Sequence, residues 1–155
     1  MFIPEHEILV TAGHEPATRK IRWRVEVKTG EMKERVGVIP DAAFAIDEAG
    51  GNTIRRRYFF VEVDRGTMPV YRKNLCNSSI RRKALAYART RKTRALRERF
   101  GIPGFQVLFV ATKRTRLARM KEVLPPGTMS KSPLFLFATP AEVADTKRWV
   151  MPQAP

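Results

Sequence analysis

The sequence predicts an α/β domain with a mixed sheet, in which a three-strand antiparallel meander precedes a helix–strand–helix–strand series. Two observations carry this prediction. Apolar segments of strand length come first, joined by short glycine-containing turns. A strand, a helix and another strand follow, and such a step within one sheet makes a parallel pair. With 155 residues and 43% hydrophobic content, we expect one domain over residues 1–150 and a loose tail at 151–155.

The three strands of the meander are predicted from apolar patterning and turns. Apolar and charged residues alternate over residues 21–27, as in a half-buried strand. The second strand, residues 35–47, bends at Pro40, because proline cannot donate to a sheet ladder. The segment "EAGGNT" then closes a hairpin onto the third strand, residues 57–64.

A long helix is predicted over residues 77–101. It starts with the capping residues Asn, Ser and Ser, and ends at Gly101 with a proline beyond. A continuous apolar run at residues 105–112 suits a strand that is buried on both faces. The remaining elements are a basic helix at 113–124, a last strand at 133–139 and a terminal helix within 140–150.

Net charge is the outlying property of the composition. The chain has 30 Lys and Arg against 15 Asp and Glu, a net charge of +15. An excess of this size indicates a polyanionic partner, of which nucleic acid is the commonest and an anionic membrane surface the alternative. No stretch approaches the ~20 apolar residues that span a bilayer. We therefore expect DNA as the partner, and no membrane.

Other classes of protein are disfavoured by what the sequence lacks. Cys76 is the only cysteine, which excludes an intramolecular disulfide and a cysteine-based zinc site. The first ten residues carry two Glu and no basic region, so we expect no signal peptide and a cytoplasmic location. No glycine-rich phosphate loop follows a strand, which disfavours nucleotide hydrolysis.

Basic side chains crowd the two predicted helices more densely than solubility requires. We expect them to bind the DNA backbone, although a merely solvated helical face is the alternative. These residues are Arg81, Arg82, Arg89, Arg91, Lys92, Arg94, Arg97 and Arg99 on the first helix and Arg114, Arg116, Arg119 and Lys121 on the second.

Carboxylates gather at the end of the third strand. Glu62 and Asp64 are two residues apart, so an extended strand places them on one face. Asp41 lies beside the proline bend, and pairing of the second and third strands would bring it to the same sheet edge as Glu62. Glu26, at the end of the first strand, is a fourth candidate. Carboxylates that converge in this way suit a hard divalent cation. Solvated acids, or acids paired with nearby Arg, are the alternative.

A lysine on the long helix is predicted to face these acids. Lys83 falls within the apolar stripe that contains Ile80 and Tyr87, at helical spacing. A lysine on a core face is costly unless a carboxylate neutralises it, and Asp64 or Glu62 is the natural partner. The alternative role is a structural ion pair with a snorkelling stem.

Three segments, "IPDAAFAI", "FFVEVDRGT" and "SIRRKALAYA", resemble the replication-relaxation family of plasmid and mobile-element proteins. The resemblance covers roughly residues 6–123. The same series resembles the PD-(D/E)XK nuclease-like superfamily, whose core has three strands, a helix and a strand in that order. The resemblance also implies an upstream winged helix-turn-helix domain, so we expect this chain to be a truncated relative or a stand-alone module.

The resemblance implies roles for particular residues. Pro40 and Asp41 would be the "PD" and Glu62 the "(D/E)", whereas Asp64 stands where the superfamily has lysine. Lys83 would replace that lysine from the helix. Asp41 and Glu62 would then hold Mg²⁺ or Mn²⁺, and Asp41, Glu62, Asp64 and Lys83 would form the catalytic set.

The function we expect is therefore that of a DNA-binding protein of plasmid or mobile-element replication or relaxation, with a restriction-endonuclease-like core. Metal-dependent nicking of DNA is a possible activity of this core. Other replication or mobilisation proteins are further expected partners. One alternative is a non-catalytic accessory protein on the same fold, in which the acids and bases form a structural ion-pair network. The other is a protein that binds structured RNA.

Overall fold

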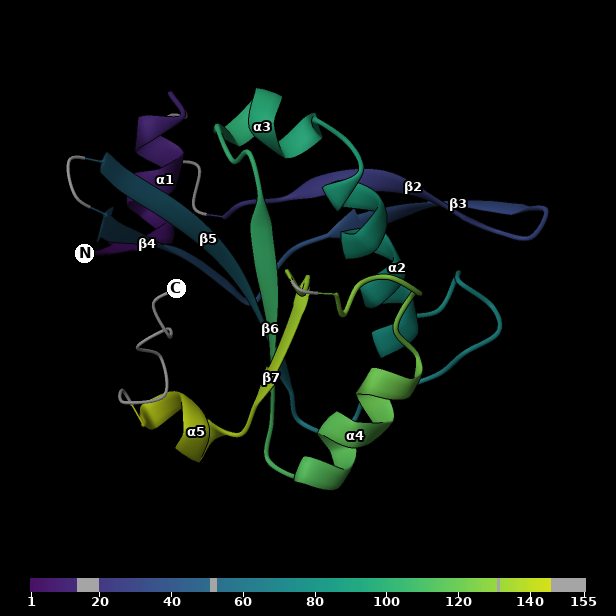
Figure 1. Ribbon diagram of the computed structural model, residues 1–155. Helices are drawn as coiled ribbons and strands as arrows, with labels where there is room; N and C mark the ends of the chain where they lie inside the picture. Colours follow the sequence, from purple (N-terminus) through teal and green to yellow (C-terminus); the bar gives the residue numbers. More distant parts are fainter. Residues whose placement is uncertain (14–19, 51–52, 131, 146–155) are drawn as a thin grey trace.

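The computed structural model describes residues 1–13, 20–50, 53–130 and 132–145. It has a five-stranded mixed sheet of order β1-β4-β5-β6-β7 and a separate antiparallel pair, β2-β3 (Figure 1). The predicted mixed α/β class is therefore confirmed. The strands are β1 (Phe2–Pro4), β2 (Trp23–Thr29), β3 (Met32–Val38), β4 (Ala42–Gly50), β5 (Thr53–Asp64), β6 (Phe105–Ala111) and β7 (Phe135–Ala138). The helices are α1 (Glu5–Thr11), α2 (Ile80–Arg91), α3 (Ala95–Phe100), α4 (Arg114–Glu122) and α5 (Pro140–Ala144).

The main sheet changes from antiparallel to parallel at β5. This strand pairs with β4 in antiparallel fashion and with β6 in parallel fashion, and β6 pairs in parallel with β7. The carboxyl ends of β5, β6 and β7 therefore meet at one edge of the sheet. Helix α4 follows β6 and α5 follows β7, so both lie at this edge (Figure 1). None of the described helices is long and apolar enough to cross a bilayer.

The predicted three-strand meander is wrong in its first two strands. The segment predicted as one bent strand at residues 35–47 is divided at Pro40 between β3 and β4, which belong to different sheets. Strand β2 pairs with β3 and not with the main sheet. The alternating apolar residues of this hairpin bury one face, and Trp23 Nε1 donates to Thr90 Oγ1 of α2 at 2.8 Å. The hairpin thus packs its buried face on α2. The alternation of apolar residues predicts a buried face but does not show whether the strand belongs to the main sheet.

The predicted helix at residues 77–101 is two helices, α2 and α3. Ser79 is the N-cap of α2, as predicted, and its side chain accepts from the Arg82 N–H. Tyr87 and Leu96 are both buried. At about 3.6 residues per turn, a continuous helix would place Leu96 on the side opposite to Tyr87. A turn after α2 lets both side chains reach the core. Gly101 closes α3 in the left-handed conformation, with φ 66°.

The main core is formed by buried side chains of the main sheet, the β2-β3 hairpin and helices α1, α2, α3 and α4. Phe60 of β5 packs against Trp23 and Tyr87, with ring centroids 5.2 and 6.1 Å away. Side chains alternate along a strand, so Glu62 and Asp64 continue the inward row that Phe60 begins. The strand therefore carries two carboxylates into the interior. The terminal helix ends at Ala144, Asp145 is its C-cap, and residues 146–150 of its predicted range lie outside the described residues.

Candidate nucleic-acid interface and buried acid–base site

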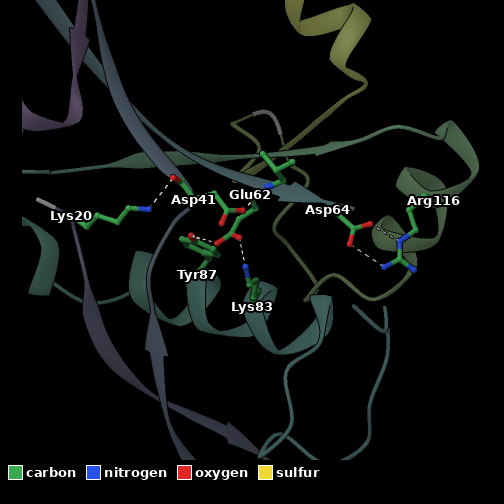
Figure 2. Close-up of polar contacts among 8 residues, drawn as sticks. Lys20, Asp41, Glu62, Asp64, Lys83, Tyr87 and Arg116 are labelled. Carbon is green, nitrogen blue, oxygen red and sulfur yellow. Dashed lines mark hydrogen bonds and ion pairs between the residues drawn. The ribbon is translucent and has the colours of Figure 1, made fainter. Parts of the chain in front are cut away.

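Glu62 is a buried carboxylate with two partners on α2. Its side chain is 3% exposed, and Oε1 accepts a 2.7 Å hydrogen bond from the Tyr87 hydroxyl. Oε2 forms an ion pair with Lys83 Nζ (Figure 2). The prediction that Lys83 faces the sheet and meets a carboxylate is confirmed, with Glu62 as the partner. Both oxygens of Glu62 are thus engaged by protein donors.

Burial dominates the electrostatics of this cluster. It raises the pKa of Glu62, and repulsion from Asp41 adds to the effect, while Lys83 and the Tyr87 hydroxyl oppose it. Burial, together with the neighbouring Glu62 carboxylate, holds the pKa of Tyr87 well above its usual value. Tyr87 therefore keeps its proton at neutral pH and acts as a hydrogen-bond donor to Glu62.

Asp64 is paired separately, with Arg116 of α4. Arg116 Nε donates to Oδ2 at 2.7 Å and Nη2 to Oδ1 at 3.2 Å, a bidentate arrangement (Figure 2). The same guanidinium donates to the Met68 carbonyl in the loop after β5. The alternative pairing of Asp64 with Lys83 does not form. Arg116, expected to bind DNA, instead has its guanidinium engaged inside the protein.

The sequence held a signal for this second pair. Parallel strands end at the same sheet edge, and Asp64 is in register with Ala111 at the end of β6. A base in the first turn of the helix after β6 is therefore within reach of Asp64. Sequence reasoning assigned Arg116 by charge density alone and missed this geometry.

Asp41 lies immediately before β4, and its side chain is exposed. Its Oδ2 accepts from the Val63 N–H at 2.8 Å, and its own N–H donates to the Val61 carbonyl at 3.0 Å. Lys20 Nζ donates to the Asp41 carbonyl at 3.3 Å (Figure 2). The carboxylate thus ties the start of β4 to the end of β5, beside Glu62.

Glu26, the fourth carboxylate considered, is not brought to this edge. It is exposed on the β2-β3 hairpin and lies opposite Arg35. Because the hairpin is separate from the main sheet, the end of the first predicted strand does not meet the end of the third. Its predicted place beside Glu62 is wrong.

The donor set does not fit a divalent ion as it stands. Across the described ranges, no group of three or more His, Cys, Asp and Glu could hold a metal ion. The oxygens of Glu62 and Asp64 accept from Lys83, Tyr87 and Arg116, so metal binding would have to displace ion pairs. The ion shared by Asp41 and Glu62 stays a prediction.

The predicted DNA-binding residues fall into two groups. One group is exposed along the end of α2, the turn after it and α3. Within this group Arg91 donates to the Ser132 carbonyl, with both contacts at 3.3 Å. The members are Arg89, Arg91, Lys92, Arg94, Arg97 and Arg99.

The second group is partly buried or contacts other side chains of the protein. The Arg81 guanidinium lies 5.1 Å from the centre of the Tyr71 ring, and Arg82 is half-buried. Arg114 forms an ion pair with Glu142 at 2.8 Å. Arg119, by contrast, is exposed on α4. The exposed cations therefore lie mainly beyond the middle of α2, away from the Glu62 cluster.

A comparison with known protein families gives one match. A family model described as replication-relaxation matches residues 6–120, which include β4, β5, α2 and most of α4. No curated protein and no solved structure matches the chain. The matched range contains both the buried acid–base site and the exposed cations of α2 and α3.

Proposed function

The chain belongs to the replication-relaxation family. We propose that it binds DNA through the basic helices α2 and α3 and does not cut the DNA itself. Family membership gives it a role in the replication or relaxation of a plasmid or mobile element. DNA binding and the absence of cleavage are our inferences from the charge distribution and from the partners of the buried acids.

The exposed cations of α2 and α3 carry the proposal. Residues 80–100 contain a single acid, Glu98, so this surface has almost no internal neutralisation. Lys92, Arg94 and Arg97 are exposed, and no ion pair described here includes them. A surface of this kind suits the phosphate backbone, which supplies most of the affinity of sequence-independent DNA binding.

The strand order supports a PD-(D/E)XK-like core for this proposal. Antiparallel β4 and β5 are followed by α2 and then by β6, which is parallel to β5. On the resemblance to this superfamily, Asp41, just before β4, and Glu62, near the end of β5, would be the two acids of the motif. Asp64, where the motif has lysine, is neutralised by Arg116, and Lys83 reaches Glu62 from the helix.

The pairing of the acids favours a binder over a nuclease. A metal-dependent cut needs carboxylate oxygens that are available to the ion. In this chain the bases that neutralise Glu62 and Asp64 come from α2 and α4, and they join those helices to the end of β5. The acid–base site then serves to hold α2 and α4 in place on the sheet.

The salt dependence of DNA affinity tests the proposed footprint, which is the set of phosphate contacts made by the exposed cations of α2 and α3. Log affinity should fall linearly with log salt, with a slope of about −0.9 for each phosphate contacted. The triple change Arg89→Ala, Arg94→Ala and Arg97→Ala should flatten that slope by about two to three units if each side chain neutralises one phosphate. Fluorescence anisotropy with a labelled duplex over a salt series measures it.

A matched triple variant on the hairpin controls for the loss of net charge. Arg24→Ala, Lys28→Ala and Lys33→Ala remove the same charge from exposed positions of β2 and β3. This variant should keep the wild-type slope. If only the hairpin variant flattened the dependence of log affinity on log salt, the phosphate contacts would be made by β2 and β3 and not by α2 and α3. Stronger competition by structured RNA than by duplex DNA would replace DNA with RNA as the ligand.

The metal hypothesis is tested in parallel. Isothermal titration of Mn²⁺ into the protein, with and without DNA, should show no binding at the acid–base site. Plasmid nicking should be absent in Mg²⁺ and in Mn²⁺. Nicking that disappears in Asp41→Asn and in chelator would establish the nuclease and overturn the non-catalytic proposal.

A further inference from the structure

A second cleft lies beyond Asp64, at the carboxyl ends of β5 and β6. Its volume is 360 Å³, against 210 Å³ for the cleft over Glu62 and Lys83. The two clefts share Asp64 and Arg65 and are therefore neighbours. The larger cleft is lined mainly by charged and hydroxyl side chains, among them Arg65, Thr112, Lys113, Thr115, Arg116 and Arg119.

The lining of this larger cleft has an excess of positive charge. Asp64 is its only acid, and that acid is matched by Arg116 in the bidentate pair. The other three bases, Arg65, Lys113 and Arg119, are exposed, and none takes part in an ion pair with another described residue. Three positive charges thus face one cleft without internal compensation.

The backbone of the cleft is fixed on both sides. Arg65 directly follows β5, and Gly66 after it has φ 84°, a conformation that other residues adopt only with strain. The Arg116 guanidinium holds both Asp64 and the Met68 carbonyl, so it ties this loop to α4. The cations are therefore presented from anchored elements, which lowers the ordering cost of binding an anion.

The charge of the cleft selects among the phosphates that DNA offers. An internal phosphodiester carries one negative charge and belongs to a continuous backbone, which a flat basic surface binds well. A phosphate monoester at a strand end carries about −1.5 to −2 charges at neutral pH and three strong acceptor oxygens. Three cations and the hydroxyls of Thr112 and Thr115 match the monoester better than the diester. A cleft of 360 Å³ is within the usual range for small-ligand sites.

We propose that this cleft binds the terminal phosphate of a DNA strand, at an end or at a nick. The inference rests on the proposed DNA binding and deepens it, because it adds a site for broken strands to a surface that binds continuous ones. The basic helices α2 and α3 would hold the duplex, and Arg65, Lys113 and Arg119 would distinguish a phosphorylated end from a hydroxyl end.

Anisotropy competition with four duplex probes of one sequence tests the cleft. One probe is closed by hairpins at both ends, and three carry a single nick with a 5′-phosphate, a 3′-phosphate or hydroxyls only. We expect about tenfold tighter binding to one phosphorylated nick than to the hydroxyl nick, as one to two charge-assisted hydrogen bonds would give. Equal affinity for all three nicked probes would overturn the inference.

Variants locate the effect. Lys113→Gln and the double change Arg65→Gln with Arg119→Gln should abolish the preference for the phosphorylated nick. Arg55→Gln is the matched control, because Arg55 is exposed near the start of β5, whereas the cleft lies at the carboxyl end of this strand. It should keep the preference. A preference that survives in the cleft variants would place the phosphate elsewhere and overturn the assignment.

The closed probe separates this inference from the proposed function. Binding to the closed duplex without any preference among the nicked probes would leave the basic-helix footprint intact and remove only the cleft. Failure to bind the closed duplex, together with a phosphate preference that the cleft variants lose, would support the cleft and contradict the footprint on α2 and α3.

Discussion

The two ends of β5 both carry ion pairs, but they are built differently. Near its start, Arg56 and Arg57 pair with Asp47 and Glu48 on the neighbouring strand β4. At its end the acids are on β5 itself, and the bases reach them from α2 and α4. The first arrangement joins two adjacent strands, whereas the second joins helices to the sheet.

Burial gives these pairs opposite electrostatic consequences. The hydrogen bond from Arg56 lowers the pKa of Asp47, so this acid is more stable as a carboxylate than it is in the unfolded chain. Burial raises the pKa of Glu62 in spite of its two donors. An ion pair therefore contributes stability at one end of the strand and compensates for desolvation at the other.

Lys83→Glu should produce the largest loss of stability. It removes the partner of Glu62 and adds a second carboxylate beside a buried one, and an unpaired buried charge typically costs ~3–5 kcal/mol. Urea unfolding at neutral pH measures the loss. Lys83→Met should cost less, because Glu62 can take up a proton and keep its bond to Tyr87. Equal losses of unfolding free energy in the two variants would mean that the charge at position 83 does not affect the buried Glu62 carboxylate.

Arg116→Met comes next, with an expected loss of about 3 kcal/mol. It leaves Asp64 buried without a base and removes the donor to the Met68 carbonyl. Arg114→Met is the matched control on the same helix, since Arg114 is largely exposed and pairs with Glu142 at the surface. Comparable losses in both variants would show that the Asp64 pair has no special weight.

Only part of this difference between the two ends of β5 can be predicted from the sequence. The inward direction of Lys83 could be predicted, because Ile80 and Tyr87 set the phase of the helix around it. The pair of Arg116 and Asp64 is not visible in local pattern; its signal appears only when the expected parallel pairing of two strands is combined with the position of Arg116 in the first turn of the next helix. The α/β class followed from the order of apolar segments and helix formers.

The errors in the fold have the same origin. Alternation at residues 21–27 predicted a half-buried strand, and β2 is one, but the pattern does not say which surface covers the buried face. Pro40 predicts a bend within one strand, whereas it separates two strands of different sheets. The cleft between β5 and α4 had no signal in the sequence, because Arg65 and Lys113 lie far apart along the chain.

The two ends should respond to pH with opposite signs. The native state holds the Glu62 proton more tightly than the unfolded chain, so the contribution of Glu62 to the unfolding free energy falls as pH rises above about 4.5. Asp47 binds its proton less tightly when folded, so its contribution is present above 3.8 and is lost as pH falls further. Unfolding of Glu62→Gln and Asp47→Asn across pH, each compared with the wild type, should give differences of opposite slope. Slopes of the same sign would remove the distinction between the two ends.

The smallest expected effect belongs to Glu48→Gln. Exposed pairs typically contribute 0.2–1 kcal/mol, and Arg57 keeps two other contacts when Glu48 is neutralised. Its guanidinium also donates to Gln106, and it lies 5.2 Å from the centre of the Phe59 ring. The loss should therefore stay below about 1 kcal/mol in urea unfolding and should shrink further in 1 M salt, because screening reaches exposed pairs first. Lys83→Met, measured in the same salt series, should keep most of its loss, since Glu62 is removed from the solvent. Glu48→Gln could instead lose as much stability as Lys83→Met, with as little dependence on salt. The ion pairs at the start of β5 would then be as desolvated as those at its end.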